Sequence, residues 1–166
     1  MRILKSVLMI ILFLIANISL SGDVWSQQRN ADKESQKIDW LEFEKALSMA
    51  EDDSMKVMLF MEADWCTLCK KMKKEVFPNP EIQATLKEKF HSVRINIESE
   101  DTIVFRGVEQ SKKELSKDFG LYATPTFIFL SSDKSVIGNK PGYMDKKEFL
   151  ELLQFVANGD YKEAGF

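Results

Sequence analysis

Hydrophobic and polar residues follow one another along the chain in blocks that favour strands and helices by turns. Lys56–Met61 is an apolar run bounded by charges, and Ser92–Ile97 alternates apolar with polar residues, so both predict strands. Thr126–Leu130, a Ser-Ser-Asp-Lys turn and Ser135–Ile137 predict a hairpin. Helical periodicity predicts helices that begin near positions 39, 66, 80, 111 and 145, the last ending at Asn158. This order predicts an α/β fold with a central mixed sheet and helices on both faces.

Two of these helices have capping signals at their starts. Asp39, with an acidic residue three positions later, predicts a capped helix that carries Trp40 and Phe43 on one face. Ser111 with Glu114 predicts a second capping box, because the serine hydroxyl can accept from the third backbone N–H while the glutamate returns the bond.

The N-terminus has the three-part organisation of an export signal. Arg2 and Lys5 form a positive region, Val7–Ala16 is an apolar region, and small serines at the −3 and −1 positions predict cleavage before Gly22. An uncleaved membrane anchor over residues 3–20 is the alternative, because about 18 apolar residues are the lower limit for crossing a bilayer. Either form places the protein in an exported compartment, where disulfides persist.

The signal divides the chain into three segments. We predict a signal peptide over residues 1–21, a polar flexible leader over residues 22–37 and one folded domain over residues 38–166. The whole chain has 166 residues, a length that suits one domain.

Composition and charge exclude several classes of protein. Twelve phenylalanines and a formal net charge of only −3 argue against intrinsic disorder. With 23 basic against 26 acidic residues, no basic surface is expected, so a nucleic-acid partner is not predicted. Two cysteines and one histidine cannot complete the usual four-ligand zinc site, so no metal is predicted.

Candidate chemistry lies at Cys66-Thr-Leu-Cys69, directly after a buried-type strand and at the start of a helix. Free backbone N–H groups and the helix dipole at that position lower a thiol pKa, which favours the attacking thiolate of Cys66. Cys69, one turn further, could resolve a mixed disulfide, and this chemistry requires only Cys66 to be exposed. A purely structural disulfide, half of a zinc site and inert cysteines are the alternatives; attached haem would need a histidine where Lys70 stands.

Two segments together resemble the thioredoxin-fold family. Phe60–Met72 carries the cysteine pair, and Tyr122–Phe129 carries Ala-Thr-Pro-Thr before a strand; the resemblance runs from about Lys56 to Val156. It is strongest to the exported thioredoxin-like group that includes SoxW and the C-terminal domain of the thiol:disulfide interchange protein DsbD. The resemblance implies a three-layer sandwich with a central mixed sheet and helices on both faces.

The resemblance also implies roles for five residues. Cys66 would be the nucleophile, Cys69 the resolving cysteine, and Trp65 the aromatic residue before the nucleophile that contacts substrate. Pro125 would be a cis-proline facing the disulfide, and Thr124 would offer its backbone to a bound substrate strand. From the residues alone, a trans proline at a strand edge is the default.

The sequence departs from the family pattern near the strand before the cysteines. Members often carry a buried aspartate six residues before the nucleophile, as proton acceptor for the resolving cysteine, and here that residue is Phe60. Glu62 has the same strand parity and is a candidate proton acceptor; an exposed carboxylate at the strand end is the alternative. The Thr-Leu dipeptide between the cysteines leaves the redox direction open, while Thr124 before the proline favours a reductant.

Other charged residues receive structural interpretations. His91, between a predicted helix and strand, is interpreted as a solvated surface histidine. Lys70, Lys71, Lys73 and Lys74 are interpreted as a solvated helix face that also favours the Cys66 thiolate.

The sequence therefore predicts an exported thiol–disulfide oxidoreductase of the periplasm or cell envelope. Its expected partners are disulfide-containing substrate proteins and a thiol electron donor, for which a membrane-bound carrier is one candidate. No cofactor is expected beyond the redox-active pair Cys66–Cys69. An oxidant or isomerase using the same site, and a non-catalytic thioredoxin-fold module that binds peptides, are the alternatives.

Overall fold

The computed structural model describes residues 37–163, so the predicted signal peptide and almost all of the leader lie outside the described residues. The strands are β1 (Trp40–Leu41), β2 (Lys56–Glu62), β3 (Phe90–Asn96), β4 (Thr102–Phe105), β5 (Val108–Ser111), β6 (Thr126–Leu130) and β7 (Val136–Pro141). The helices are α3 (Phe43–Asp53), α4 (Thr67–Lys71), the π-helix η1 (Met72–Val76), α5 (Pro80–Lys89), α6 (Lys112–Asp118), α7 (Lys146–Asn158) and the 3₁₀ turn η2 (Asp160–Lys162). No helix within this range has the length and apolar character needed to cross a membrane.

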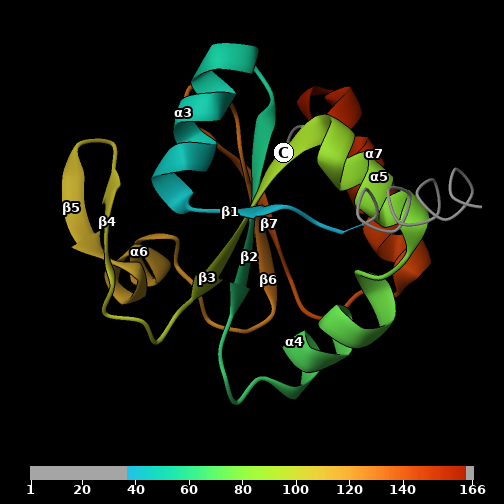
Figure 1. The fold of residues 1–166 in the computed structure, drawn as a ribbon, viewed down its shortest axis with the longest axis horizontal. Helices are drawn as coiled ribbons and strands as arrows, with labels where there is room; N and C mark the ends of the chain where they lie inside the picture. Colours follow the sequence, from blue (N-terminus) through green and yellow to red (C-terminus); the bar gives the residue numbers. More distant parts are fainter. Residues whose placement is uncertain (1–36, 164–166) are drawn as a thin grey trace, which may run out of the picture. The chain divides into compact units, whose positions relative to one another are not determined.

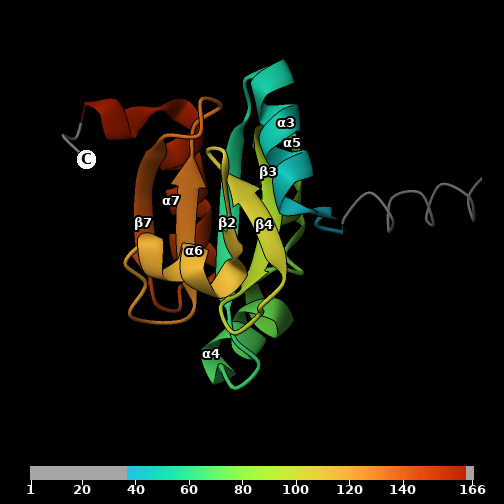
Figure 2. The same ribbon diagram turned by 90° about the vertical axis from the view of Figure 1, so that its left-hand side faces the viewer.

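A five-stranded mixed sheet with the order β1-β3-β2-β6-β7 forms the centre of the domain (Figure 1). β1, β3 and β2 are parallel, while β6 runs antiparallel to both β2 and β7. Helices α5 and α7 cover one face; α3, α6 and the β4–β5 hairpin lie on the other, and Figure 2 shows α6 and β4 in front of the sheet. This arrangement confirms the predicted three-layer α/β sandwich.

Alternation along β2 divides the core between these two faces. Met58 and Phe60 point into the cluster under α5 and α7, whereas Val57, Leu59 and Met61 point into the cluster under α3. All five are completely buried. Because one strand supplies both clusters, it is apolar from Val57 to Met61, between charged residues at its two ends, as its sequence predicted.

Aromatic rings fill the α5–α7 side of the core. The Phe60 ring stacks on Phe127 with centroids 5.3 Å apart and meets Phe77 edge-on at 5.0 Å. Phe149 of α7 lies 4.7 Å from Phe127, so the last helix is held against the sheet by ring contacts.

The capped helix predicted from Asp39 is wrong in its first turn. Trp40 belongs to β1 and pairs with Ser92 of β3; α3 begins only at Phe43, and its N-cap Glu42 makes no side-chain capping bond. The cause is tertiary, because residues 40 and 41 pair with β3 and the Trp40 ring packs against Phe77, with centroids 5.5 Å apart.

The interpretation of His91 as a solvated surface residue is also wrong. β3 begins at Phe90, two residues earlier than predicted, so His91 lies within the strand and is 6% exposed. Its Nε2 lies 2.9 Å from the Asp53 carboxylate at the end of α3, which gives the buried ring a polar partner.

Candidate active site

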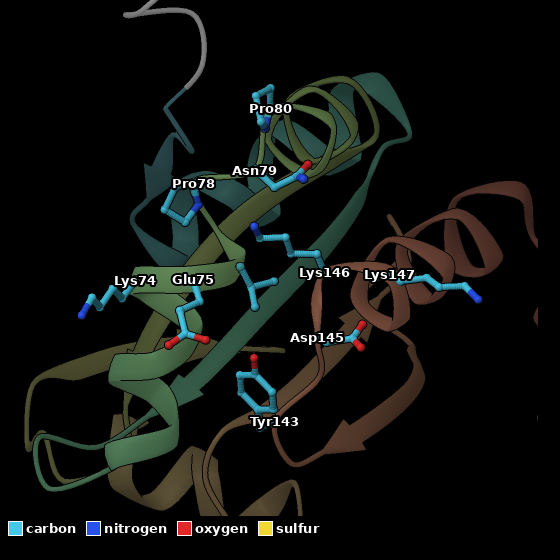
Figure 3. Close-up of a pocket in the computed structure, with 10 residues that line it drawn as sticks. Lys74, Glu75, Pro78, Asn79, Pro80, Tyr143, Asp145, Lys146 and Lys147 are labelled. Carbon is cyan, nitrogen blue, oxygen red and sulfur yellow. The ribbon is translucent and has the colours of Figure 1, made fainter.

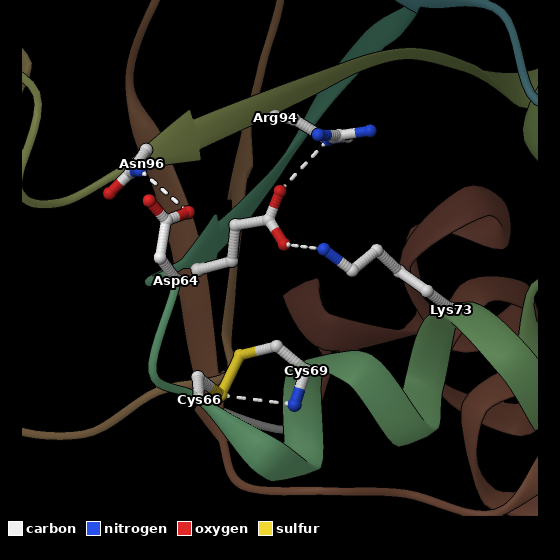
Figure 4. Close-up of polar contacts among 7 residues, drawn as sticks. Asp64, Cys66, Cys69, Lys73, Arg94 and Asn96 are labelled. Atoms are coloured by element: carbon white, nitrogen blue, oxygen red, sulfur yellow. Dashed lines mark hydrogen bonds and ion pairs between the residues drawn. A yellow bond between two sulfur atoms is a disulfide. The ribbon is translucent and has the colours of Figure 1, made fainter.

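The two cysteines lie where β2 ends and α4 begins. A short turn follows Glu62, closed by a hydrogen bond from the Cys66 N–H to the Ala63 carbonyl at 3.1 Å. Cys66 is the N-cap of α4, and its Sγ accepts a hydrogen bond from the Cys69 N–H at 3.0 Å. The two residues form a disulfide, with Cα atoms 5.3 Å apart (Figure 4).

Both sulfurs are buried in this oxidised form. Cys66 is 2% exposed and Cys69 is completely buried, so the expectation of an exposed Cys66 is wrong for the disulfide. The residues around them are open instead, with Trp65 at 64% and Leu68 at 45% exposure. Two large apolar side chains are thus exposed next to a nearly buried disulfide.

The second motif reaches the same edge of the sheet. Thr126 at the start of β6 pairs with Met61 near the end of β2, so the segment before β6 and the turn carrying Cys66 leave neighbouring strands at one end. The Thr124–Pro125 peptide bond is cis, the form that the resemblance implies. The Pro125 carbonyl accepts a hydrogen bond from the Gly142 N–H at 2.8 Å.

Thr124 has an unusual environment for a hydroxyl. Its Oγ1 is buried and has no hydrogen-bond partner, although buried polar atoms are ordinarily paired. Nearby Tyr122 is 83% exposed. The loop before the cis-proline therefore contains a buried hydroxyl without a hydrogen-bond partner and an exposed aromatic ring.

Glu62 is the one acidic residue buried within residues 37–163, at 6% exposure. Its carboxylate accepts from Lys73 Nζ at 2.5 Å and from Arg94 Nε at 2.9 Å, and Figure 4 draws both ion pairs. The alternative of an exposed carboxylate at the strand end is wrong. Lys73 lies in η1, the segment that continues the helix of the cysteines, so the carboxylate connects this helix to β3.

Sequence reasoning did not identify Lys73 and Arg94 as partners of this carboxylate. They lie 11 and 32 residues from Glu62 in the chain, and no local pattern joins them. Within the described range, no group of three or more His, Cys, Asp and Glu side chains could hold a metal ion.

Comparisons with known proteins agree with this geometry. The family model of the thioredoxin-like domain matches residues 43–157. The thiol:disulfide interchange protein DsbD of Actinobacillus pleuropneumoniae is 28% identical over 163 residues, which cover 91% of this chain and 26% of that protein. The chain therefore spans about a quarter of the length of this curated relative.

Solved structures show the same fold. A thioredoxin from Thermus thermophilus superposes with a TM-score of 0.58 at 23% identity, over 72% of this chain and 87% of that one. The reduced C-terminal domain of DsbD from Neisseria meningitidis gives a TM-score of 0.52 at 22% identity, over 67% and 90% of the two chains.

A mixed sheet that holds a Cys-x-x-Cys disulfide beside a cis-proline defines the thioredoxin class of α/β domains. The match over residues 43–157 places this protein within it: the chain belongs to the thioredoxin-like domain family.

Proposed function

We propose that the protein is a thiol–disulfide oxidoreductase that reduces or exchanges disulfides of exported proteins. In the reduced enzyme the Cys66 thiolate attacks one sulfur of a substrate disulfide, and the other substrate sulfur leaves as a thiolate. Cys69 then attacks the Cys66 sulfur of the mixed disulfide and releases the second substrate thiolate. Two electrons pass to the substrate, whose sulfurs take up two protons, and the Cys66–Cys69 disulfide remains.

The observation that carries this proposal is the Cys66–Cys69 disulfide at the N-cap of α4, with the cis-proline segment leaving the neighbouring strand at the same sheet edge. Backbone N–H groups at a helix start stabilise a thiolate, and one of them already contacts Cys66 Sγ. Trp65, the backbone of Thr124 and the cis-proline Pro125 are the proposed substrate contacts.

We propose two alternatives for Glu62, which experiment separates. As a proton acceptor it would take the proton of the Cys69 thiol; as a positioning residue it would hold η1 against β3 through Lys73 and Arg94. The two existing ion pairs favour the positioning role, because both carboxylate oxygens already have partners. A Glu62→Gln variant that keeps the pH profile of the resolution step supports positioning, and a changed profile supports proton acceptance.

The reduction potential of the pair tests the proposal and its direction. The full chain is equilibrated in thiol buffers of defined potential, and free thiols are alkylated and counted. A value near about −270 mV, as for thioredoxin, supports a reductant that is re-reduced by a thiol electron donor. A value near about −120 mV indicates an oxidant, and the absence of any reversible titration contradicts oxidoreductase function.

Trapping separates catalysis from the alternative of a peptide-binding module. Cys69→Ser should accumulate mixed disulfides through Cys66, visible on non-reducing gels and absent from the Cys66→Ser/Cys69→Ser double variant. A double variant that supports the cellular function as well as the native chain would favour the binding module.

We further propose that the protein acts in the periplasm or cell envelope after export by residues 1–21. Fractionation and intact mass test this directly. A mature form beginning at Gly22 supports a cleaved signal, a full-length membrane-bound form supports an anchor, and a cytosolic full-length form contradicts export.

A further inference from the structure

A groove of about 770 Å³ lies beside the active-site helix (Figure 3). One wall is formed by η1 and the start of α5, over residues 74–80, and the other by residues 143–147, which lead into α7. The groove contains neither cysteine.

Two contacts connect this groove to the active site. The Gly142 N–H donates to the Pro125 carbonyl, and the next residue, Tyr143, lines the groove. From the other side, the amine of Lys71, two residues after Cys69, lies 4.4 Å from the centroid of the Tyr143 ring. Through Gly142 and Lys71, the Tyr143 wall of the groove therefore neighbours both the cis-proline segment and the helix that carries the cysteines.

Lysines outnumber acidic residues in the lining of the groove. Lys74 and Lys146 line it and form no ion pair with any residue of the described part of the chain. In Figure 3 the Lys146 side chain extends toward Asn79 on the opposite wall, while Lys74 and Lys147 point outwards. Lys147 has only a 3.8 Å contact with the well exposed Glu151.

Both acidic residues of the lining have contacts within the chain and keep their negative charge. Asp145 caps α7 by accepting the Glu148 N–H at 2.9 Å, and Glu75 lies 3.9 Å from the Lys71 amine. With three lysines against two acidic residues, the lining has a formal charge of +1 in a chain whose formal net charge is −3, which makes it a local reversal of charge.

We propose that this groove binds an acidic, extended segment of the partner protein, next to the disulfide that the enzyme exchanges. The inference rests on the proposed function and names the chemistry of its partner. Charge complementarity at such a site raises association rates for acidic partners and lowers them for basic ones. A protein segment fits better than a small anion, because the groove measures about 770 Å³ and its Tyr143 wall follows Gly142, whose N–H binds the Pro125 carbonyl.

The test uses the reduced full chain and peptides that share one disulfide and differ only in flanking residues, all Glu, all Ser or all Lys. At low salt we expect the Glu peptide to be reduced about tenfold faster than the Ser peptide, and the Lys peptide more slowly. The difference should vanish near 1 M salt, where the screening length is about 3 Å. Equal rates for the three peptides would overturn the proposal.

Variants locate the effect. Lys74→Glu/Lys146→Glu should abolish the preference for the Glu peptide, whereas the charge-matched control Lys45→Glu/Lys87→Glu, on exposed positions of α3 and α5, should retain it. If both variants lose the preference for the Glu peptide equally, the preference comes from overall charge, and the proposal of a binding groove is overturned.

Two further measurements separate this inference from the proposed function. Turnover of the small neutral disulfide bis(2-hydroxyethyl) disulfide reports the cysteine chemistry alone. Binding of a cysteine-free Glu peptide to the oxidised full chain, followed by fluorescence anisotropy, reports the groove alone and should be lost in Lys74→Glu/Lys146→Glu. Full displacement of that peptide by an equal charge of inorganic phosphate would indicate a simple anion site. That result would overturn the proposal that the groove binds a peptide segment.

Discussion

Glu62→Gln removes the buried carboxylate at the edge of the sheet while keeping its size. The side chain of Glu62 is 8% exposed, but its partners Lys73 and Arg94 are 38% and 47% exposed. Loss of one partner of a fully buried ion pair costs about 3–5 kcal/mol, and an exposed pair contributes about 0–1 kcal/mol. Because water can hydrate the two cations left behind, we expect Glu62→Gln to lower the free energy of unfolding by about 1–2 kcal/mol.

Removing both cations should be more costly than removing the anion. Lys73→Met or Arg94→Met alone leaves the carboxylate one partner, and each should cost about 1 kcal/mol. The double variant leaves a charge buried without any partner, so we expect about 3–5 kcal/mol, more than the sum of the single effects. This asymmetry follows from the unequal exposure of the three side chains.

Urea unfolding of the oxidised full chain, followed by tryptophan fluorescence, gives these free energies. Glu88→Gln is the matched control, because Glu88 and its partner Lys89 are both at least half exposed and should contribute less than about 0.5 kcal/mol. A Lys73→Met/Arg94→Met variant no less stable than Glu62→Gln would refute the argument from burial.

Two further predictions concern stability. Phe149→Ala removes a fully buried ring of the core and should cost about 3–5 kcal/mol in urea unfolding; a loss below about 2 kcal/mol would show that the core closes around the gap. The pKa of Asp53 is lowered from 3.8, mainly by the hydrogen bond from the Met55 N–H and further by His91. A carboxyl group with a lowered pKa stabilises the fold above pH 3.8, and this stabilisation is lost as the pH falls through the lowered value. The difference in unfolding free energy between the native chain and Asp53→Asn should therefore shrink below about pH 4. A difference that stays constant with pH would contradict this prediction.

Local signals in the sequence predicted the elements that depend on a few neighbouring residues. The capping box at Ser111 and Glu114 is present, and Asp145 with Glu148 forms a second one at the start of α7. These motifs are closed by hydrogen bonds within four residues, so a local signal identifies them where no distant contact overrides it.

Errors arose where distant contacts decide the local structure. Trp40 has a capping signal beside it but lies in β1, because its ring packs on Phe60 and Phe77 from other elements. The β4–β5 hairpin was not predicted, although the short apolar run Ile103–Phe105 before an Arg-Gly turn was a usable signal.

The candidate site also has features that neighbouring residues determine and features that distant contacts determine. The spacing of Cys66 and Cys69 and the position of Pro125 could be read from the sequence and its family resemblance. The two cations at Glu62 could not, because they come from η1 and β3 and meet only when those elements pack on β2. Strand parity correctly indicated that the Glu62 side chain points inward, but not what it would contact there.

The placement of charge near the cysteines follows from the rings around position 60. Phe60 is completely buried between aromatic neighbours, with Phe127 stacked on its ring, so a carboxylate there would have no polar partner. Two residues along β2, at the strand end, Glu62 is within reach of cations whose other sides face water. That position lowers the cost of burying the charge, and it makes the carboxylate a link between β3 and the segment that follows Cys69. This link is the basis of the positioning role proposed for Glu62, in which the carboxylate would act on the cysteines only through the helix that carries them.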